Sequence, residues 1–251
     1  MDPMLNPNQS PPAMTAERLF ATTHWSVVST SQTAGSPQAE KALATLCQSY
    51  WYPLYCFVRR QGHNAHDAQD LVQGFFAKVI EKGYFKDARR EKGRLRSFLL
   101  LALKRFMANE WDRANRQKRG GGHEIVSLNL DETESRFLAE SAHHASIDRD
   151  FDRQWAIALL DQVLSQLESE CAAAGTGRMF DELKIFLSGE KSERPYAEIA
   201  RQLGVAEGTL RGAVFRLRQR YREILLAKIG ETVEGAEEVE AELRDLLAVL
   251  S

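Results

Sequence analysis

The segment from residue 195 to residue 225, PYAEIARQLGVAEGTLRGAVFRLRQRYREIL, constrains the fold of this chain more than any other stretch. Pro195 suits the start of a helix, and Gly204 can adopt the left-handed turn conformation between two runs of helical spacing. In the second run, apolar residues three or four positions apart form one stripe: Leu210, Val214, Leu217, Tyr221 and Ile224. The spacing therefore predicts two helices joined by a tight turn, with this stripe buried against the first helix.

Arginines accompany the stripe of the second helix without sharing it. Five flank it on its two sides: Arg211, Arg216, Arg218, Arg220 and Arg222. Thr209, Gly212, Phe215 and Gln219 occupy the face between them. Guanidinium groups on both flanks can straddle a groove and contact phosphates on both of its walls. The pattern therefore favours a helix-turn-helix whose second helix enters the major groove of DNA.

Two points about this motif stay open from the sequence. Phe215 could contact a thymine methyl group, or it could equally pack on a neighbouring helix. Ala206 stands where a serine or threonine cap is expected, at a loss of about 1 kcal/mol. The alternative to a DNA-binding motif is a packed helical hairpin with a charged outer face.

The chain is nearly neutral only because charged blocks cancel. Residues 1–123 hold 18 basic and 10 acidic residues, residues 124–190 hold 5 and 14, residues 191–228 hold 9 and 4, and the last 23 residues hold 1 and 7. Two basic blocks, an acidic connector and an acidic tail suggest two separate contacts with a polyanion, although solvated charged faces could produce part of this pattern.

Helical periodicity dominates the remaining sequence, and the alternation typical of strands is almost absent. We expect an all-α protein of two small helical domains. The expected order is a disordered arm, a first helical domain, an acidic linker, a helix-turn-helix domain and an acidic amphipathic helix, at residues 1–15, 16–120, 121–150, 151–230 and 231–251.

A second basic cluster lies between Lys86 and Arg119, with 12 basic and 4 acidic residues. Trp111 projects away from the apolar face of this segment, whereas Phe98 and Phe106 fit a core better. Cations interleaved with aromatic rings suit a channel for single-stranded nucleic acid, because cations follow the backbone and rings receive unstacked bases.

The sequence at this point resembles a known family. The resemblance is carried by YWYPLYCFVRR, the following DAQDLVQGFFAKV, the Arg-rich loop and helix, and YAEIA with LRQRYRE. The family is that of bacterial RNA polymerase sigma factors of the two-domain extracytoplasmic-function type. The first three elements resemble their second conserved region, and YAEIA with LRQRYRE resembles their fourth region. FATTHWSVV resembles the lead-in of a subgroup abundant in planctomycete-like bacteria. The resemblance covers about two thirds of the chain, and it implies a sigma factor that brings core RNA polymerase to promoter DNA.

The resemblance also implies roles for individual residues. The expected polymerase-binding residues are Asp67, Asp70, Gln73 and Phe76. The residues expected to open the promoter and hold the non-template strand are Lys92, Arg94, Arg96, Arg105, Asn109 and Trp111. The residues expected to bind the upstream element are Thr209, Arg211, Phe215, Arg216, Arg218 and Arg220. Gly74 departs from the family, in which an acidic residue usually follows the glutamine.

Other functions fit the sequence less well. A helix-turn-helix transcriptional regulator would leave the DAQDLVQGFFAKV helix unexplained, and a sigma-like decoy that binds polymerase or an anti-sigma factor is a further alternative. No catalytic constellation, phosphate loop or metal-ligand spacing stands out, so we expect no enzyme, cofactor, metal or small-molecule substrate. Three irregularly spaced cysteines and the lack of a long apolar run predict a cytoplasmic protein without a membrane contact.

Overall fold

The computed structural model describes residues 37–82, 94–116, 130–140, 146–187, 194–233 and 235–251. Every regular element within these ranges is helical, which confirms the all-α prediction. Three expectations lie outside the described residues: the arm at residues 1–15, the lead-in that follows it, and Lys92.

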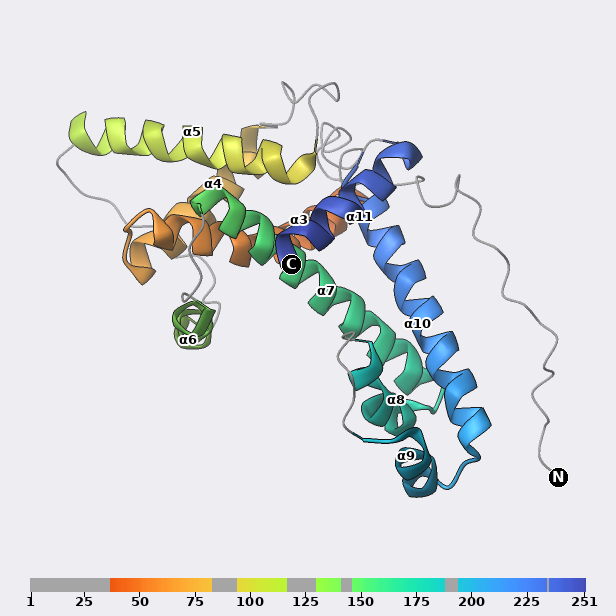
Figure 1. Ribbon diagram of the computed structural model, residues 1–251. Coiled ribbons are helices and arrows are strands. Elements are labelled where there is room, and N and C mark those ends of the chain that lie inside the picture. Colours follow the sequence, from red (N-terminus) through yellow and green to blue (C-terminus); the bar gives the residue numbers. More distant parts are fainter. Residues whose placement is uncertain (1–36, 83–93, 117–129, 141–145, 188–193, 234) are drawn as a thin grey trace.

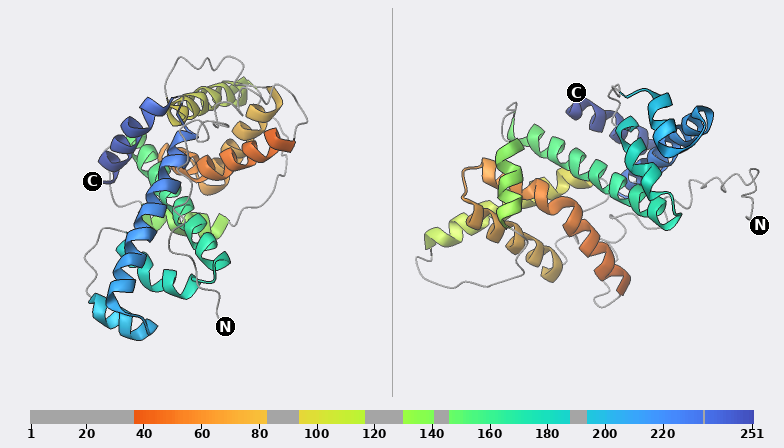
Figure 2. Two further views of the ribbon diagram at one scale, coloured as in Figure 1. Left: turned by 90° about the vertical axis from the view of Figure 1, so that its right-hand side faces the viewer. Right: turned by 90° about the horizontal axis from the view of Figure 1, so that it is seen from below.

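The helices form a broad upper part and a narrower limb (Figures 1 and 2). The upper part contains α3 (Pro37–Arg60), α4 (Ala65–Lys82), α5 (Leu95–Arg116), α6 (Leu130–Glu140) and α11 (Ala236–Leu250). The limb contains α7 (Ile147–Ala173), α8 (Gly177–Leu183), the 3₁₀ turn η3 (Lys184–Phe186), α9 (Tyr196–Leu203) and α10 (Glu207–Gly230). The helix α7 runs from the upper part into the limb, and α10 returns beside it toward α11.

Local capping explains where two of these helices begin. The Ser146 hydroxyl accepts a hydrogen bond from the backbone N–H of Arg149 at 3.1 Å, and acidic residues follow in the first turn of α7. The Asn64 side-chain oxygen likewise accepts from the N–H of Asp67 at 2.9 Å at the start of α4. Such caps satisfy N–H groups that have no partner within the helix, and the acidic side chains match the positive end of the helix dipole.

One hydrophobic core joins helices from both sides of the predicted linker. It includes Tyr50 of α3, Phe75 of α4, Leu99 of α5, Trp155 of α7 and Leu246 of α11, each almost fully buried. The long helix α7 contacts α3 at its beginning and α10 farther along. Described helices of both expected domains therefore contribute to one core.

Part of the predicted linker is a helix. The acidic stretch has weak periodicity, yet residues 130–140 form α6, and α7 begins within the same predicted linker. Phe137 is buried against α3, and Glu134 accepts hydrogen bonds from Tyr55 and Arg59. A helix this short is marginal by itself, so tertiary contacts that local periodicity does not reveal stabilise it.

The helix-turn-helix forms as predicted. Gly204 ends α9 with a φ of 69°, in the left-handed region that favours glycine, and α10 begins after Ala206 without a side-chain cap. A separate small core holds α8, η3, α9 and the start of α10 together: Leu183, Phe186, Ile199, Ala200, Leu210 and Val214. The predicted stripe is thus buried in this core at Leu210 and Val214, whereas Ile224 farther along α10 is buried in the larger core.

Candidate nucleic-acid and partner interfaces

The outer face of α10 carries the residues expected to bind an upstream DNA element. Phe215 is 68% exposed, and Thr209 and Arg216 are exposed beside it. Phe215 therefore does not pack on a neighbouring described helix, which removes one of the two interpretations of this aromatic residue. An exposed ring with a cation next to it, opposite a buried stripe, is a surface suited to contact another molecule.

Two further arginines expected to bind DNA, Arg211 and Arg218, already have partners within the chain. Arg211 donates to Glu207 of the same helix at 2.6 and 3.0 Å. Arg218 donates twice to the carbonyl oxygen of Phe186, at 2.9 and 3.0 Å, and so ties α10 to η3. Both arginines are exposed, but the two hydrogen bonds of Arg218 hold its guanidinium against η3.

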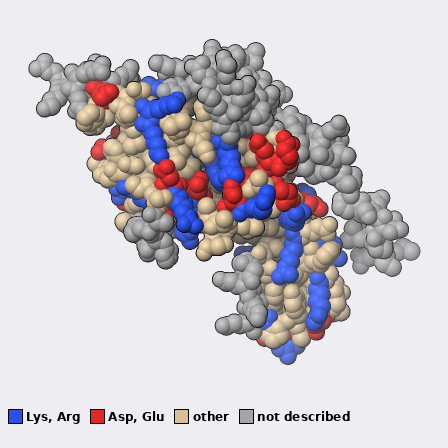
Figure 3. All heavy atoms as spheres, turned by 45° about the horizontal axis from the view of Figure 1, so that its top comes forward, with Lys and Arg blue, Asp and Glu red and all other residues tan. Residues whose placement is uncertain are grey.

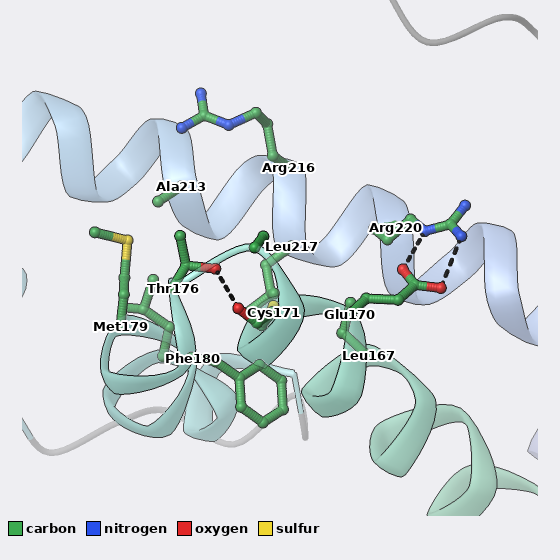
Figure 4. A pocket seen from close by; sticks show the side chains of 12 residues that line it. Leu167, Glu170, Cys171, Thr176, Met179, Phe180, Ala213, Arg216, Leu217 and Arg220 are labelled. Carbon is green, nitrogen blue, oxygen red and sulfur yellow. Dashed lines mark hydrogen bonds and ion pairs between the residues drawn. The ribbon is translucent and has the colours of Figure 1, made fainter. Parts of the chain in front are cut away.

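Arg220 joins α10 to α7 by a two-pronged ion pair with Glu170 (Figure 4). Its Nε and Nη2 donate to the two carboxylate oxygens at 2.8 and 2.9 Å. The hydrogen bonds from Arg220 hold the pKa of Glu170 below its usual range. This geometry gives Arg220 a structural role, so its expected contact with DNA would require the pair to open.

A largely apolar pocket of about 380 Å³ lies between α7, α8 and α10 (Figure 4). Leu167, Met179 and Phe180 line it, and Arg216 stands at its rim with the guanidinium pointing away from the cavity. Arg216 is therefore directed outward, on the same side of the molecule as the exposed face of α10.

The start of α5 carries two of the arginines expected to hold a melted strand, and both contact α11. Arg94 pairs with Glu242, Nε to Oε2 at 2.7 Å, and with Asp245. Arg96 pairs with Glu242 and with Asp152 of α7, both at 3.2 Å, and its guanidinium lies 4.7 Å from the centre of the Trp155 ring. In this arrangement Arg96 is buried and cannot contact a nucleic acid directly.

The second half of α5 remains open. Arg105 and Asn109 are exposed, and Trp111 is 68% exposed. The structure thus divides the expected strand-binding residues into an open group along α5 and a group covered by α11. In Figure 3, acidic and basic side chains adjoin one another in the middle of the face shown, whereas mainly basic side chains lie along the limb, in the lower part of the view.

The expected polymerase-binding residues of α4 do not share one exposure. Asp67 and Asp70 are exposed, and Asp70 lies 3.1 Å from the ring of His66. Gln73 is partly buried, and Phe76 is 5% exposed. Phe76 packs beside Phe75 in the core, so in this structure it does not lie on the surface with Asp67 and Asp70: its position on the helix turns it inward.

A groove of about 650 Å³ runs between α4 and α5 beside these carboxylates. Leu71, Phe106, Met107 and Trp111 form its apolar wall, and Asp67, Asp70 and Glu110 add carboxylates. Gly74 also lines it, and a Cβ atom there would lie 3.4 Å from Cζ of Phe106, an ordinary van der Waals contact. Because Gly74 has no side chain, the groove stays open at the position where the acidic side chain usual in the family would enter it.

The sequence did not single out the acidic partners of these arginines. Asp152, Glu134 and Glu242 lie in segments whose negative charge was evident, but no periodicity links them to the basic residues they meet. Burial raises the pKa of Asp152 and of Glu242, because desolvation outweighs the attraction of Arg96 in each case. The charge-block pattern was the only signal of these contacts.

Among the described residues, none of the helices is both long and apolar enough to cross a membrane, and no cluster of histidine, cysteine, aspartate or glutamate side chains could hold a metal ion. Comparisons with models of protein families, with curated proteins and with solved structures found no match to this chain.

Proposed function

We propose that this protein is an RNA polymerase sigma factor, which directs core polymerase to promoters through its helix-turn-helix and opens DNA with the region around α5. The observation that carries the proposal is the outer face of α10. There Phe215 and Arg216 are exposed on a helix whose opposite face is buried in the helix-turn-helix core. Such a helix can lie in a major groove with its cations near the phosphates.

The open half of α5 supports a second contact with DNA. Arg105 and Asn109 supply polar groups to a backbone, and Trp111 offers an exposed ring on which an unpaired base can stack. Unpairing a base costs a few kcal/mol, so stacking and hydrogen bonding to the released strand must offset it. The two surfaces together would hold the intact and the opened part of one promoter.

The carboxylates of α4 support docking of the polymerase. Asp67 and Asp70 are exposed beside the apolar groove that contains Trp111, so a helix with basic and apolar residues would match this surface in charge and in shape. The helix α4 lies apart from α10 (Figure 1). In the proposed function, the limb would bind the intact upstream DNA, and the upper part would bind the polymerase and the opened DNA of the same promoter complex.

Run-off transcription with core bacterial polymerase and a promoter library tests the proposal. The intact protein should yield promoter-dependent transcripts, Arg216→Ala should lose promoter selection, and Arg105→Ala should lose strand opening while keeping polymerase binding. Arg178→Ala removes an exposed arginine from α8 and serves as the matched control. Failure of the intact protein to co-elute with polymerase would overturn the proposal.

A helix-turn-helix regulator that acts without polymerase is the second candidate. The ion pairs that occupy Arg94 and Arg96 favour it, because they leave the face of α10 as the more accessible cationic surface. Binding of duplex DNA with full sequence preference in the absence of polymerase, together with no transcript in its presence, would support this candidate.

A further inference from the structure

The start of α5 has the character of a site for negatively charged groups. Arg94 precedes the helix and Arg96 lies in its first turn, so two guanidinium groups add to the positive end of the helix dipole. Within α5's first turn the structure places no acidic residue that would neutralise them. A helix start with two cations attracts a polyanion more strongly than either feature alone.

The acidic helix α11 occupies this site in the described arrangement. Glu242 and Asp245 lie three residues apart, on one face of α11, and both contact Arg94. Glu242 also reaches Arg96, and Leu246 on the next turn is fully buried in the core. Thus α11 presents two negative charges to the two arginines and an apolar anchor to the helices beneath.

The inner part of this contact is incompletely compensated. Arg96 Nη1 lies 3.2 Å from Glu242 and Arg96 Nε lies 3.2 Å from Asp152, but neither nitrogen makes an aligned hydrogen bond, although both are buried. Buried charges without aligned hydrogen bonds recover little of their desolvation cost. The outer pair of Arg94 and Asp245 is partly exposed, so a competing anion can reach it from solvent.

We propose that α11 is an internal occupant of a polyanion-binding surface formed by Arg94 and Arg96, and that single-stranded nucleic acid competes with it for these arginines. The proposal rests on the proposed function, because a strand of DNA is the expected competitor. The competitor first replaces Asp245 at Arg94, and the loss of this pair then loosens Glu242 from Arg96. The protein therefore binds a strand weakly while α11 is in place and more strongly when the outer pair is broken.

Fluorescence anisotropy with a labelled oligothymidylate and the full chain tests the competition. Asp245→Asn removes the charge of a partly exposed residue, so the fold should be kept, and its affinity for the oligonucleotide should rise about two- to five-fold, as expected for the release of one such ion pair. Glu237→Gln is the matched control: it removes one charge from the same helix at an exposed residue beside Gly235. Its affinity should rise less than that of Asp245→Asn.

Hydrogen exchange supplies a measurement that general electrostatics would not move. Addition of the oligonucleotide should speed exchange of the amides of residues 236–250, while the amides of α9 keep their rates. Equal affinities of Asp245→Asn and Glu237→Gln, or unchanged exchange in α11 when the strand binds, would overturn the inference, and so would the absence of any strand binding. If the proposed function is wrong, the protein will not co-elute with polymerase and will yield no transcripts. The anisotropy assay contains no polymerase, so its result is independent of that failure.

Discussion

Arg96 of α5 and Glu242 of α11 form an ion pair in which the two side chains are only 4% and 1% exposed. The pair links the basic segment in the first half of the chain to the acidic helix near its end, across the core that contains Trp155. Apolar packing around Trp155 and Leu246 brings the two segments together, and the pair forms where their opposite charges meet.

Breaking this pair on one side should be costly. Arg96→Met removes the buried cation beside Glu242 and leaves the partly exposed Arg94 in contact with it, and we expect a loss of up to about 3–5 kcal/mol in the free energy of unfolding by urea. The double variant Arg96→Met with Glu242→Leu replaces both charges by apolar groups and should recover much of this loss. Equal stability of the single and double variants would contradict the structural role given to the pair.

The contact between α6 and α3 should depend on pH. Hydrogen bonds from Arg59 hold the pKa of Glu134 below its ordinary value of 4.5, and the Tyr55 hydroxyl donates to the same carboxylate at 2.6 Å. A carboxylate whose pKa is lower in the folded than in the unfolded state stabilises the fold above pH 4.5, and this stabilisation is lost as the pH falls through the folded pKa.

Glu134→Gln tests this dependence. Near neutral pH the variant should be less stable than the parent by about 1–3 kcal/mol, the contribution of charge-assisted hydrogen bonds, and the difference should shrink as the pH drops below 4.5. Glu168→Gln, at an exposed residue of α7, should show no comparable difference. Thermal unfolding at a series of pH values measures both, and a difference that stays constant with pH would argue against the ion pair.

Substitutions on the buried face of α10 should lower the stability of the fold, whereas substitutions on its exposed face should weaken DNA binding. Leu210 is fully buried in the helix-turn-helix core, so Leu210→Ala should cost about 2–5 kcal/mol in unfolding free energy. Phe215→Ala, at an exposed residue, should change stability by less than about 0.5 kcal/mol and yet weaken binding to promoter duplex. Arg216→Ala should lower the slope of log affinity against log salt by about one. A stable Phe215→Ala protein with full duplex affinity would remove this face from the interface.

The carboxylates of α4 should act on the partner without affecting the fold. Asp70→Ala removes an exposed charge and should weaken binding to core polymerase in a pull-down titration, with unchanged thermal unfolding. Asp67 is a poorer test, because it also takes part in the Asn64 cap. Glu168→Ala serves as the control, and equal weakening by both variants would indicate a general charge effect only.

Gly74 offers a test of the α4 helix itself. The residue lies inside the helix, and a Cβ atom there meets only an ordinary contact with Phe106. Gly74→Ala should therefore raise the free energy of unfolding by about 0.5–1 kcal/mol through helix propensity. A decrease would show that the close approach of α4 and α5 requires the glycine.

The sequence by itself determined most of the helical elements, because apolar spacing and the turn at Gly204 act within a few residues. It predicted the buried stripe at Leu210 and Val214 and the outward direction of Trp111, both of which the structure confirms. It did not reveal that Phe76 is buried or that residues 130–140 form a helix, because both depend on the packing of neighbouring helices.

Only the tertiary structure decided which charges meet. An acidic segment of the sequence does not reveal which basic residues it will contact. The pairs form because α3, α5, α7, α10 and α11 share a core. They are Arg96 with Glu242, Arg220 with Glu170, and Arg59 with Glu134. Contacts between distant segments depend on packing of the whole chain, whereas periodicity reports only the face that a helix buries. The sequence could therefore identify the cationic surfaces, and the fold determined which of them stay open.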